Sequence, residues 1–349
     1  MEIIGGARLE VHIKPTDVGK RVSVRCLNDG GIGAEKFTDT VGVLTSWNDG
    51  VLLITRRTGE SVRIVESSLV AGKVVPTRHP TTTPQGGASR HVTMAPARRR
   101  GPATSFDELA RVTARGWQPV ESETLGEWRL RASSGFTRRA NSVLPLGDPG
   151  RPLDEALSYV RDWYAARELP AYIQTATGAE GGQELLCADL ERRGWVREVS
   201  AQVWVGGLAP VGDLDADVDQ VRLSRSYDDA WLRRYQRFGT PGPHVTAVLG
   251  SGPSVWFASV PAAGEAPAAI GRCVVDGRWA GFLAVEVDPA HRRRGLATAV
   301  MAALGRRALD EGASAAWLQV EDDNTSARAL YDGMGFAAHH SYHHYRAPE

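Results

Sequence analysis

The segment 285–304, VEVDPAHRRRGLATAVMAAL, constrains this chain more than any other part of it. It reads as a strand that runs into a basic turn and then opens a helix. A helix start leaves several backbone N–H groups unpaired, with the positive end of the helix dipole behind them. Gly295 has no side chain, so the backbone there can approach a phosphate closely, and the neighbouring arginines add positive charge. The segment therefore predicts an α/β unit with a pyrophosphate site at the turn Arg292–Ala297.

Two other interpretations of this turn are weaker. Arginine at a helix start opposes the dipole unless an anion is bound, which disfavours a merely solvated basic turn. Nucleic-acid binding by the same arginines would call for interleaved aromatic side chains, and the turn has none.

A second landmark is the segment 324–336, NTSARALYDGMGF. Asn324 is a preferred N-cap residue and stands before a predicted helix over 325–333, although it is also a candidate for cofactor contact. Tyr331 is either a core aromatic or a proton donor, because a phenol can protonate a departing thiolate. Gly335 followed by Phe336 is typical of a left-handed helix cap with an anchoring aromatic.

The chain is too long for one hydrophobic core, at 349 residues, and predicts several domains. Residues 1–75 read as short alternating strands, with hairpin turns at Asn48-Asp49-Gly50 and Thr58-Gly59-Glu60. This spacing of short strands predicts a small all-β barrel.

The segment 76–104 has a different composition, with five prolines, five arginines and no acidic residue. Such a composition cannot bury a core, so we predict a disordered linker. Its arginines 98–100 are candidates for contact with an acidic partner, but a solvated linker is the simpler interpretation.

Residues 105–213 and 214–349 read as two copies of one α/β plan. In each copy an amphipathic helix leads into a strand, a second helix and a glycine–aromatic pair, which is Gly194-Trp195 in the first copy and Gly335-Phe336 in the second.

The first copy lacks the features that would bind and turn over a phosphate-bearing cofactor. Pro152 and Asp154 stand at its helix start in place of the arginines, and Leu190 stands opposite Tyr331. We therefore expect one active site per chain, in the second copy.

In these residues the chain resembles the GNAT superfamily, the acyl-CoA-dependent N-acyltransferases. The family signature, Arg/Gln-x-x-Gly-x-Gly/Ala after the fourth strand, is met by Arg292, Gly295 and Ala297. The following strand–helix unit matches the family at Asn324, Leu330, Tyr331, Gly335 and Phe336. The resemblance implies a tandem α/β (α+β) GNAT fold with a degenerate first lobe. An SH3-like barrel ahead of it is similar to the arrangement in actinobacterial members.

The resemblance also implies acetyl-CoA as co-substrate and assigns roles to single positions. Backbone groups of Val285 and Val287 would pair with the pantetheine arm where the sheet splays, Asn324 would bind near that arm, and Tyr331 would protonate the thiolate. The implied cofactor-binding residues are Val285, Val287, Arg292, Arg293, Arg294, Gly295, Leu296, Ala297 and Asn324.

The general base is the least defined role. An ammonium ion has no lone pair, so the amine must lose a proton before it attacks a thioester. Glu286, in the strand before the turn, is the first candidate, and its alternative is an ordinary surface glutamate. Glu321, a C-terminal histidine or water are the other candidates.

Four histidines, at 339, 340, 343 and 344, lie near the C-terminus. No matching carboxylate or cysteine spacing accompanies them, and neighbours in a strand point to opposite faces, so we expect no metal site.

Composition limits the other classes of function. Lysine plus arginine equals aspartate plus glutamate at 41 each, so the chain has no bulk attraction to nucleic acid or to an anionic membrane. No apolar run is long enough for a membrane span, and no signal peptide is visible at the N-terminus. Cys26, Cys187 and Cys273 are odd in number and widely spaced, which fits a cytoplasmic protein without disulfides.

The sequence thus predicts an acetyl-CoA-dependent N-acetyltransferase that acts by direct attack of a primary amine, in a small molecule or a protein lysine. The alternatives are a non-catalytic acyl-CoA sensor or scaffold working through the barrel, and a nucleic-acid-binding protein. Residues 1–75 carry ten basic and nine acidic side chains and one tryptophan, Trp47, which favours docking to a protein partner over nucleic-acid binding.

Overall fold

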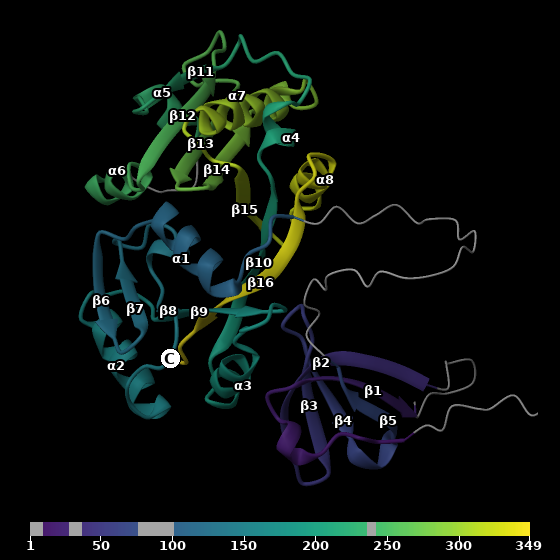
Figure 1. Ribbon diagram of the computed structural model, residues 1–349. Helices are drawn as coiled ribbons and strands as arrows, with labels where there is room; N and C mark the ends of the chain where they lie inside the picture. Colours follow the sequence, from purple (N-terminus) through teal and green to yellow (C-terminus); the bar gives the residue numbers. More distant parts are fainter. Residues whose placement is uncertain (1–9, 28–36, 76–100, 236–241) are drawn as a thin grey trace, which may run out of the picture. The chain divides into compact units, whose positions relative to one another are not determined.

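The computed structural model describes residues 10–27, 37–75, 101–235 and 242–349. The chain divides into two compact units, residues 1–98 with 176–193 and residues 99–175 with 194–349 (Figure 1). The predicted linker lies outside the described residues apart from 101–104. The predicted boundaries at residues 75, 104 and 213 stay predictions.

The described strands of the first unit form an antiparallel five-stranded sheet of order β4-β3-β2-β1-β5. Its elements are η1 (Pro15–Asp17), β1 (Arg21–Leu27), β2 (Phe37–Asn48), β3 (Val51–Thr55), β4 (Ser61–Val65), η2 (Glu66–Ser68) and β5 (Leu69–Val74). Asp49 and Gly50 have φ values of 50° and 71°, which makes the predicted two-residue hairpin between β2 and β3. The side chains of Val22, Leu44 and Leu52 fill the core of this small all-β domain.

Strand β5 was not predicted from the sequence. It pairs with β1, and a side chain at its Gly72 would collide with Ile13, so close packing requires a residue of weak strand propensity there. Helix α3 (Glu184–Arg192) also belongs to this unit, where Thr177 Oγ1 donates to the Arg57 carbonyl at 2.9 Å.

The second unit contains most of both α/β copies. The first copy has α1 (Phe106–Gly116), β6 (Glu121–Leu125), β7 (Trp128–Ala132), η3 (Arg138–Ala140), β8 (Leu144–Pro145), α2 (Leu153–Ala165), β9 (Tyr172–Thr177), β10 (Val196–Gly207) and α4 (Ala209–Gly212). The second copy has β11 (Arg222–Ser224), α5 (Asp229–Arg234), α6 (Pro243–Leu249), β12 (Ser254–Val260), β13 (Ala269–Asp276), β14 (Trp279–Val287), η4 (Pro289–His291), α7 (Leu296–Asp310), β15 (Ala315–Glu321), α8 (Thr325–Gly333) and β16 (Ala337–Arg346).

The internal repeat is visible in the order of the elements. The series β6-β7-β8-α2-β9-α3-β10 recurs as β12-β13-β14-α7-β15-α8-β16. In both copies the third strand of the series meets the fourth in parallel, through a ladder between β14 and β15 and through a single bridge between Val143 and Ile173 in the first copy. The predicted tandem fold is therefore confirmed.

The two copies exchange their last strands. Within the described residues, the large sheet has the order β11-β12-β13-β14-β15-β10-β16-β9. Strand β10 of the first copy thus lies between β15 and β16 of the second, and β16 lies between β10 and β9 of the first. Figure 1 shows the yellow β16 running beside the teal β10. Each copy supplies a strand that completes the sheet of the other.

Helix α7 packs across β12, β13 and β14 on one face of this sheet (Figure 1). Its predicted apolar stripe, Leu296, Val300 and Leu304, is buried, and α4 packs beside it. Gly271 on β13 lets α7 approach closely, because an added side chain there would collide with Val300.

The opposite face of β13 carries a fully buried arginine, Arg272. Its guanidinium donates to the carbonyls of Gly116 at 2.9 Å, Leu249 at 2.7 Å and Ser251. Gly116 ends α1 and Leu249 ends α6, so the charge lies at the negative ends of two helix dipoles. Burial lowers the pKa of Arg272 to about 10, and the group stays charged at neutral pH.

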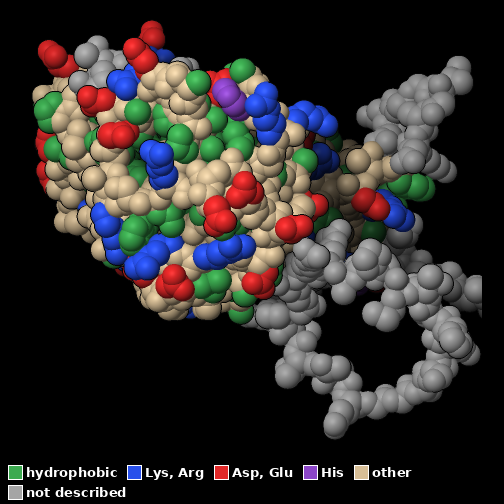
Figure 2. All heavy atoms as spheres, turned by 90° about the horizontal axis from the view of Figure 1, so that it is seen from above, with side chains coloured by type: hydrophobic (Ala, Val, Ile, Leu, Met, Phe, Trp, Pro, Cys, Tyr) green, Lys and Arg blue, Asp and Glu red, His purple; other side chains and the backbone are tan. Residues whose placement is uncertain are grey.

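The surface carries mixed charge. Figure 2 shows basic and acidic side chains interspersed over the face in view, without a broad field of either sign. None of the described helices is long and apolar enough to cross a membrane.

Candidate active site

The predicted phosphate turn lies between β14 and α7. Asp288 accepts the Ala290 N–H at 2.8 Å and also contacts Arg234, which fixes the 3-10 turn η4 ahead of the arginines. Arg293 and Gly295 then adopt left-handed φ values of 62° and 75°, and α7 begins at Leu296 as predicted. Two left-handed residues within three positions make a tight turn, and turns of this kind can direct successive backbone amides toward an anion.

The amides of this turn are available to a ligand. The first main-chain hydrogen bond into α7 runs from the Ala299 N–H to the Gly295 carbonyl at 2.9 Å. Within the described residues, the amides from Arg293 to Ala297 donate to no main-chain carbonyl. The three arginines and Gly295 are exposed, and a side chain built on Gly295 would meet no atom within 4 Å. An anion can therefore reach these amides.

Strands β14 and β15 splay apart beside this turn. Their parallel ladder ends at the pair Phe282–Leu318. Ala284 has a φ of 50° and lies in a bulge of β14. The stretch 283–286 of this strand lies opposite the shorter stretch 270–272 of β13, so β14 has one extra residue there. Residues 283–287 of β14 lie past the end of that ladder, and Val285 lines the opening there. The predicted opening of the sheet is present.

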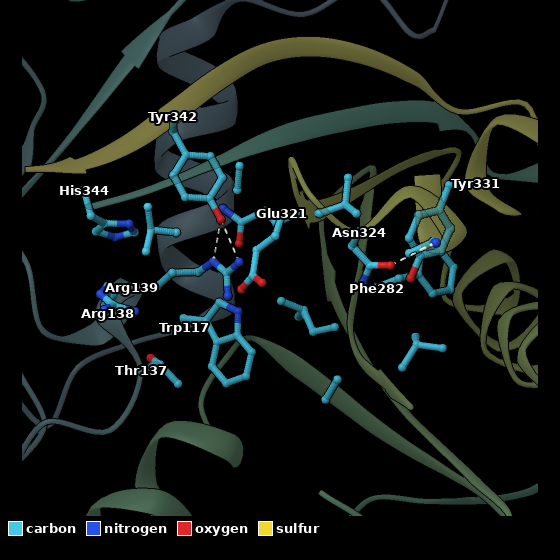
Figure 3. A pocket seen from close by; sticks show the side chains of 18 of the residues that line it. Trp117, Thr137, Arg138, Arg139, Phe282, Glu321, Asn324, Tyr331, Tyr342 and His344 are labelled. Atoms are coloured by element: carbon cyan, nitrogen blue, oxygen red, sulfur yellow. Dashed lines mark hydrogen bonds between the residues drawn. The ribbon is translucent and has the colours of Figure 1, made fainter. Parts of the chain in front are cut away.

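A cavity of about 270 Å³ lies at this opening. Figure 3 shows two groups of side chains along it, with Glu321 between them. The first group, Phe282, Asn324 and Tyr331, comes from the second copy. The second group combines the first copy with strand β16, and its labelled members are Trp117, Thr137, Arg138, Arg139, Tyr342 and His344.

The second-copy end holds two predicted site residues. Asn324 lines the cavity and also caps α8, since its side-chain oxygen accepts the Ala327 N–H at 3.1 Å. Both interpretations of Asn324 therefore remain compatible. Tyr331 lines the cavity, is half-buried, and packs its ring edge-on against Phe336 with 6.1 Å between centroids. Gly335 has the predicted left-handed φ, 89°.

The two glutamates predicted as general bases differ in position. Glu321, at the end of β15, lines the cavity. Glu286 is half-buried opposite Ile270 on β13 and is not among the residues that line it. The bulge at Ala284 shifts the alternation of side chains in β14, and nothing in the residue pattern indicates this shift.

The other end of the cavity was not predicted from the sequence. Arg139 donates from Nε and Nη2 to the Tyr342 hydroxyl at 2.9 and 2.6 Å. Arg138 contacts Glu198 at 3.4 Å, and its guanidinium lies 5.5 Å from the centre of the Tyr172 ring. These arginines stand in a loop between β7 and β8 that matches no motif, so only the fold brings them to the site.

That loop is rigidly held. Ser134 and Thr137 adopt left-handed φ values of 48° and 57°, which are unfavourable for residues with side chains. Buried Asn141 holds them there, because its oxygen accepts the Ser133 and Gly135 amides at 2.7 and 3.0 Å and its amide donates to the Phe136 and Thr137 carbonyls. Such strain persists where the surroundings enforce it, and it is concentrated at functional sites.

The C-terminal histidines divide along β16. His344 lines the cavity, and burial together with the nearby Arg139 and Arg131 holds its pKa well below the usual value. His343 is buried on the Ser200 hydroxyl at 2.8 Å, and burial lowers its pKa to about 3. The Nδ1 atoms of His339 and His340 lie 2.9 Å apart. In the described residues, no group of three or more His, Cys, Asp or Glu side chains is placed to hold a metal ion.

The first copy has no comparable cofactor turn. Helix α2 begins at Leu153 after Pro152, and Asp154 and Glu155 occupy its first turn. Two carboxylates at a helix start repel a phosphate that the dipole alone would attract.

Comparison with known proteins points to an acetyltransferase family. The family described as "Probable histone acetyltransferase Rv0428c C-terminal" matches residues 104–345, most of the chain. The chain belongs to this family. Its fold is that of the GNAT N-acetyltransferases, as the sequence predicted and as the match to a solved member below shows.

Relatives and solved structures agree with this assignment. The chain is similar to the probable histone acetyltransferase Rv0428c of Mycobacterium tuberculosis, at 27% identity over 93% of both chains. It is 25% identical to the uncharacterized N-acetyltransferase YobR of Bacillus subtilis, over 68% of this chain and 97% of that one. A GCN5-related N-acetyltransferase from Kribbella flavida matches the fold with a TM-score of 0.52 and 16% identity, over 71% of this chain and 97% of that one.

Proposed function

We propose that this protein transfers an acetyl group from acetyl-CoA to a primary amine in a ternary complex. The observation that carries the proposal is the combination of the unpaired amides from Arg293 to Ala297 with the splayed edge of β14. The first suits a pyrophosphate and the second suits a strand-like amide arm, and a cavity follows directly from that edge. Coenzyme A has these two parts in this order.

The residues divide the work as follows. The turn amides and Arg292 to Arg294 bind the pyrophosphate, Val285 and Val287 pair with the pantetheine, and Asn324 lies near that arm. The amine attacks the thioester carbonyl, whose oxygen is stabilised by backbone N–H groups of β14. The new C–N bond replaces the C–S bond, and the thiolate takes a proton from Tyr331.

Glu321 receives better support than Glu286 as the group that removes the amine proton. It lines the cavity between the cofactor end and the arginines, whereas Glu286 does not. A carboxylate reached from the cavity can accept the proton directly or through one water.

Measuring CoA release with a panel of primary amines tests this function. The wild type should release CoA only when an amine is present, and Tyr331→Phe should lower kcat about 100-fold or more, since general acids typically contribute that much. Its KM for acetyl-CoA should stay close to the wild-type value. Calorimetry provides the second arm, because binding of acetyl-CoA without turnover of any amine would mark the protein as a sensor.

The two bases can be separated by matched variants. Glu321→Gln and Glu286→Gln remove the same charge from neighbouring strands. We expect the first to lower kcat and to shift the pH profile, and the second to leave both close to wild type. The reverse result would return the role to Glu286.

A further inference from the structure

Polar atoms without partners gather around the cavity. The Trp117 Nε1 atom, the Gln319 side-chain oxygen and both ring nitrogens of His344 are buried and make no hydrogen bond within the described part of the chain. Trp117 and His344 are 3% and 2% exposed, and all three residues line the cavity. Buried polar groups are normally satisfied, so an accumulation at one cavity indicates groups that a ligand satisfies.

Three side chains on one side of the cavity can act only as hydrogen-bond donors. An indole N–H and a guanidinium have no acceptor atom, which makes Trp117, Arg138 and Arg139 hydrogen-bond donors alone. Two of the five N–H groups of Arg139 go to the Tyr342 hydroxyl. Among the described residues, no carboxylate lies within ion-pair distance of Arg139.

The pairing of Arg138 is also incomplete. Its contact with Glu198 is long at 3.4 Å, and that carboxylate is shared with Arg346 and with the Tyr172 hydroxyl. The charges of Arg138 and Arg139 are thus incompletely paired by carboxylates, and this excess of positive charge at the cavity favours an anion there.

A neighbouring side offers acceptors. Gln319 and Glu321 stand two residues apart on β15, and side chains at that spacing point to the same face of a strand. Both line the cavity. An amide oxygen and a carboxylate together suit an ammonium group or a primary amine.

We propose that the acceptor is a small amine that carries a carboxylate. Its carboxylate binds at Arg138, Arg139 and Trp117. Its amine lies toward Gln319 and Glu321, next to the place of the thioester. This inference rests on the proposed function and narrows its substrate class. It disfavours polyamines and lysines in basic protein tails, because two arginines would repel them.

Matched acceptors test the proposal. Each amino acid is compared with its carboxamide, which keeps the amine and removes the anion, and phosphoethanolamine is compared with ethanolamine as a second anion. We expect kcat/KM for the carboxylates to exceed that for the amides by about 10- to 100-fold, the range of one charge-assisted hydrogen bond. Equal rates for acids and amides, or a preference for the phosphate, would overturn the proposal.

Variants locate the effect. Arg139→Gln should raise KM for carboxylate acceptors by about tenfold or more, leave the amides unchanged, and leave acetyl-CoA binding unaltered. Arg139→Lys keeps the charge and should retain part of the preference. Arg111→Gln is the matched control, since it removes the same charge from an exposed pair with Asp107 on α1. A loss of the preference in the control, or an equal loss for acids and amides in Arg139→Gln, would contradict the assignment.

Calorimetry separates this inference from the function it rests on. The amino acids of the acceptor panel are titrated into the wild type and into Arg139→Gln without acetyl-CoA, and the one with the largest heat of binding to the wild type is used for the comparison. If no amine is acetylated, the proposed function fails, while carboxylate binding that depends on Arg139 would still support the subsite. Absence of any binding in the wild type refutes the subsite whatever the enzyme assay shows.

Discussion

Replacing Arg272 by methionine tests whether a buried charge without a carboxylate stabilises this fold. The guanidinium is fully buried on β13 and binds the carbonyls of Gly116, Leu249 and Ser251. The guanidinium carbon also lies 4.8 Å from the centre of the Trp117 ring. Methionine has a similar length and fills the space without donating a hydrogen bond.

The magnitude follows from what the substitution leaves behind. The buried carbonyls of Gly116 and Leu249 and the half-buried carbonyl of Ser251 lose their partner, and each unsatisfied buried group costs about 1–3 kcal/mol. Removing the guanidinium also removes the free energy needed to bury a charge, which offsets a large part of that sum. We expect a net loss of about 3 kcal/mol in the free energy of unfolding, or about 6–12 °C in Tm for a unit of this size.

Urea and thermal unfolding of the full chain measure the loss. Arg115→Met is the control, because Arg115 joins the same helix α1 to the end of β13 through a 2.6 Å pair with Asp276 but is 42% exposed. An exposed pair contributes about 0.2–1 kcal/mol. If Arg272→Met were within about 1 kcal/mol of wild type, the cost of burying the charge would equal the gain from its hydrogen bonds, and the reasoning would be refuted.

Two further predictions concern the cofactor turn and acid stability. Gly295→Ala places a side chain at a left-handed φ of 75° with no atom within 4 Å, so stability should fall by only about 1–2 kcal/mol while KM for acetyl-CoA rises and kcat stays near wild type in steady-state assays. The pKa of His343 is lowered to about 3 from an ordinary value of 6.5, so the folded state binds fewer protons than the unfolded state between these values. Stability should therefore fall as pH drops below 6.5, by about 1.4 kcal/mol per pH unit from this residue, and urea midpoints of His343→Asn should show a shallower slope.

Local features of the site could be predicted from the sequence. Helix α7 begins at Leu296 and α8 at Thr325, as the turn and the cap residue indicated. Both signals are short-range, because a left-handed glycine and an asparagine cap act within one helical turn.

Long-range features could not be predicted. Alternation along β10 and β16 shows that each is a strand but does not specify its neighbour, since that choice depends on contacts across the whole fold. The arginines of the loop at residues 137–139 carry no motif, and their place at the cavity depends on the same pairing. The place of Glu286 in the strand before the turn makes it the first candidate base in the sequence, but Glu321 and not Glu286 lines the cavity. The bulge at Ala284, which changes the direction of side chains in β14, leaves no mark in the residue pattern.

Because β10 and β16 are exchanged, neither copy has a complete sheet without the other. Cutting the chain between the copies would leave each fragment with an open edge where the other's strand had been, and unpaired strand edges promote aggregation. The first copy lacks a cofactor turn like that of the second, but it supplies the strand β10 that lies between β15 and β16. Truncation to the catalytic motifs should therefore give an insoluble fragment, although every residue implied by the family resemblance would still be present.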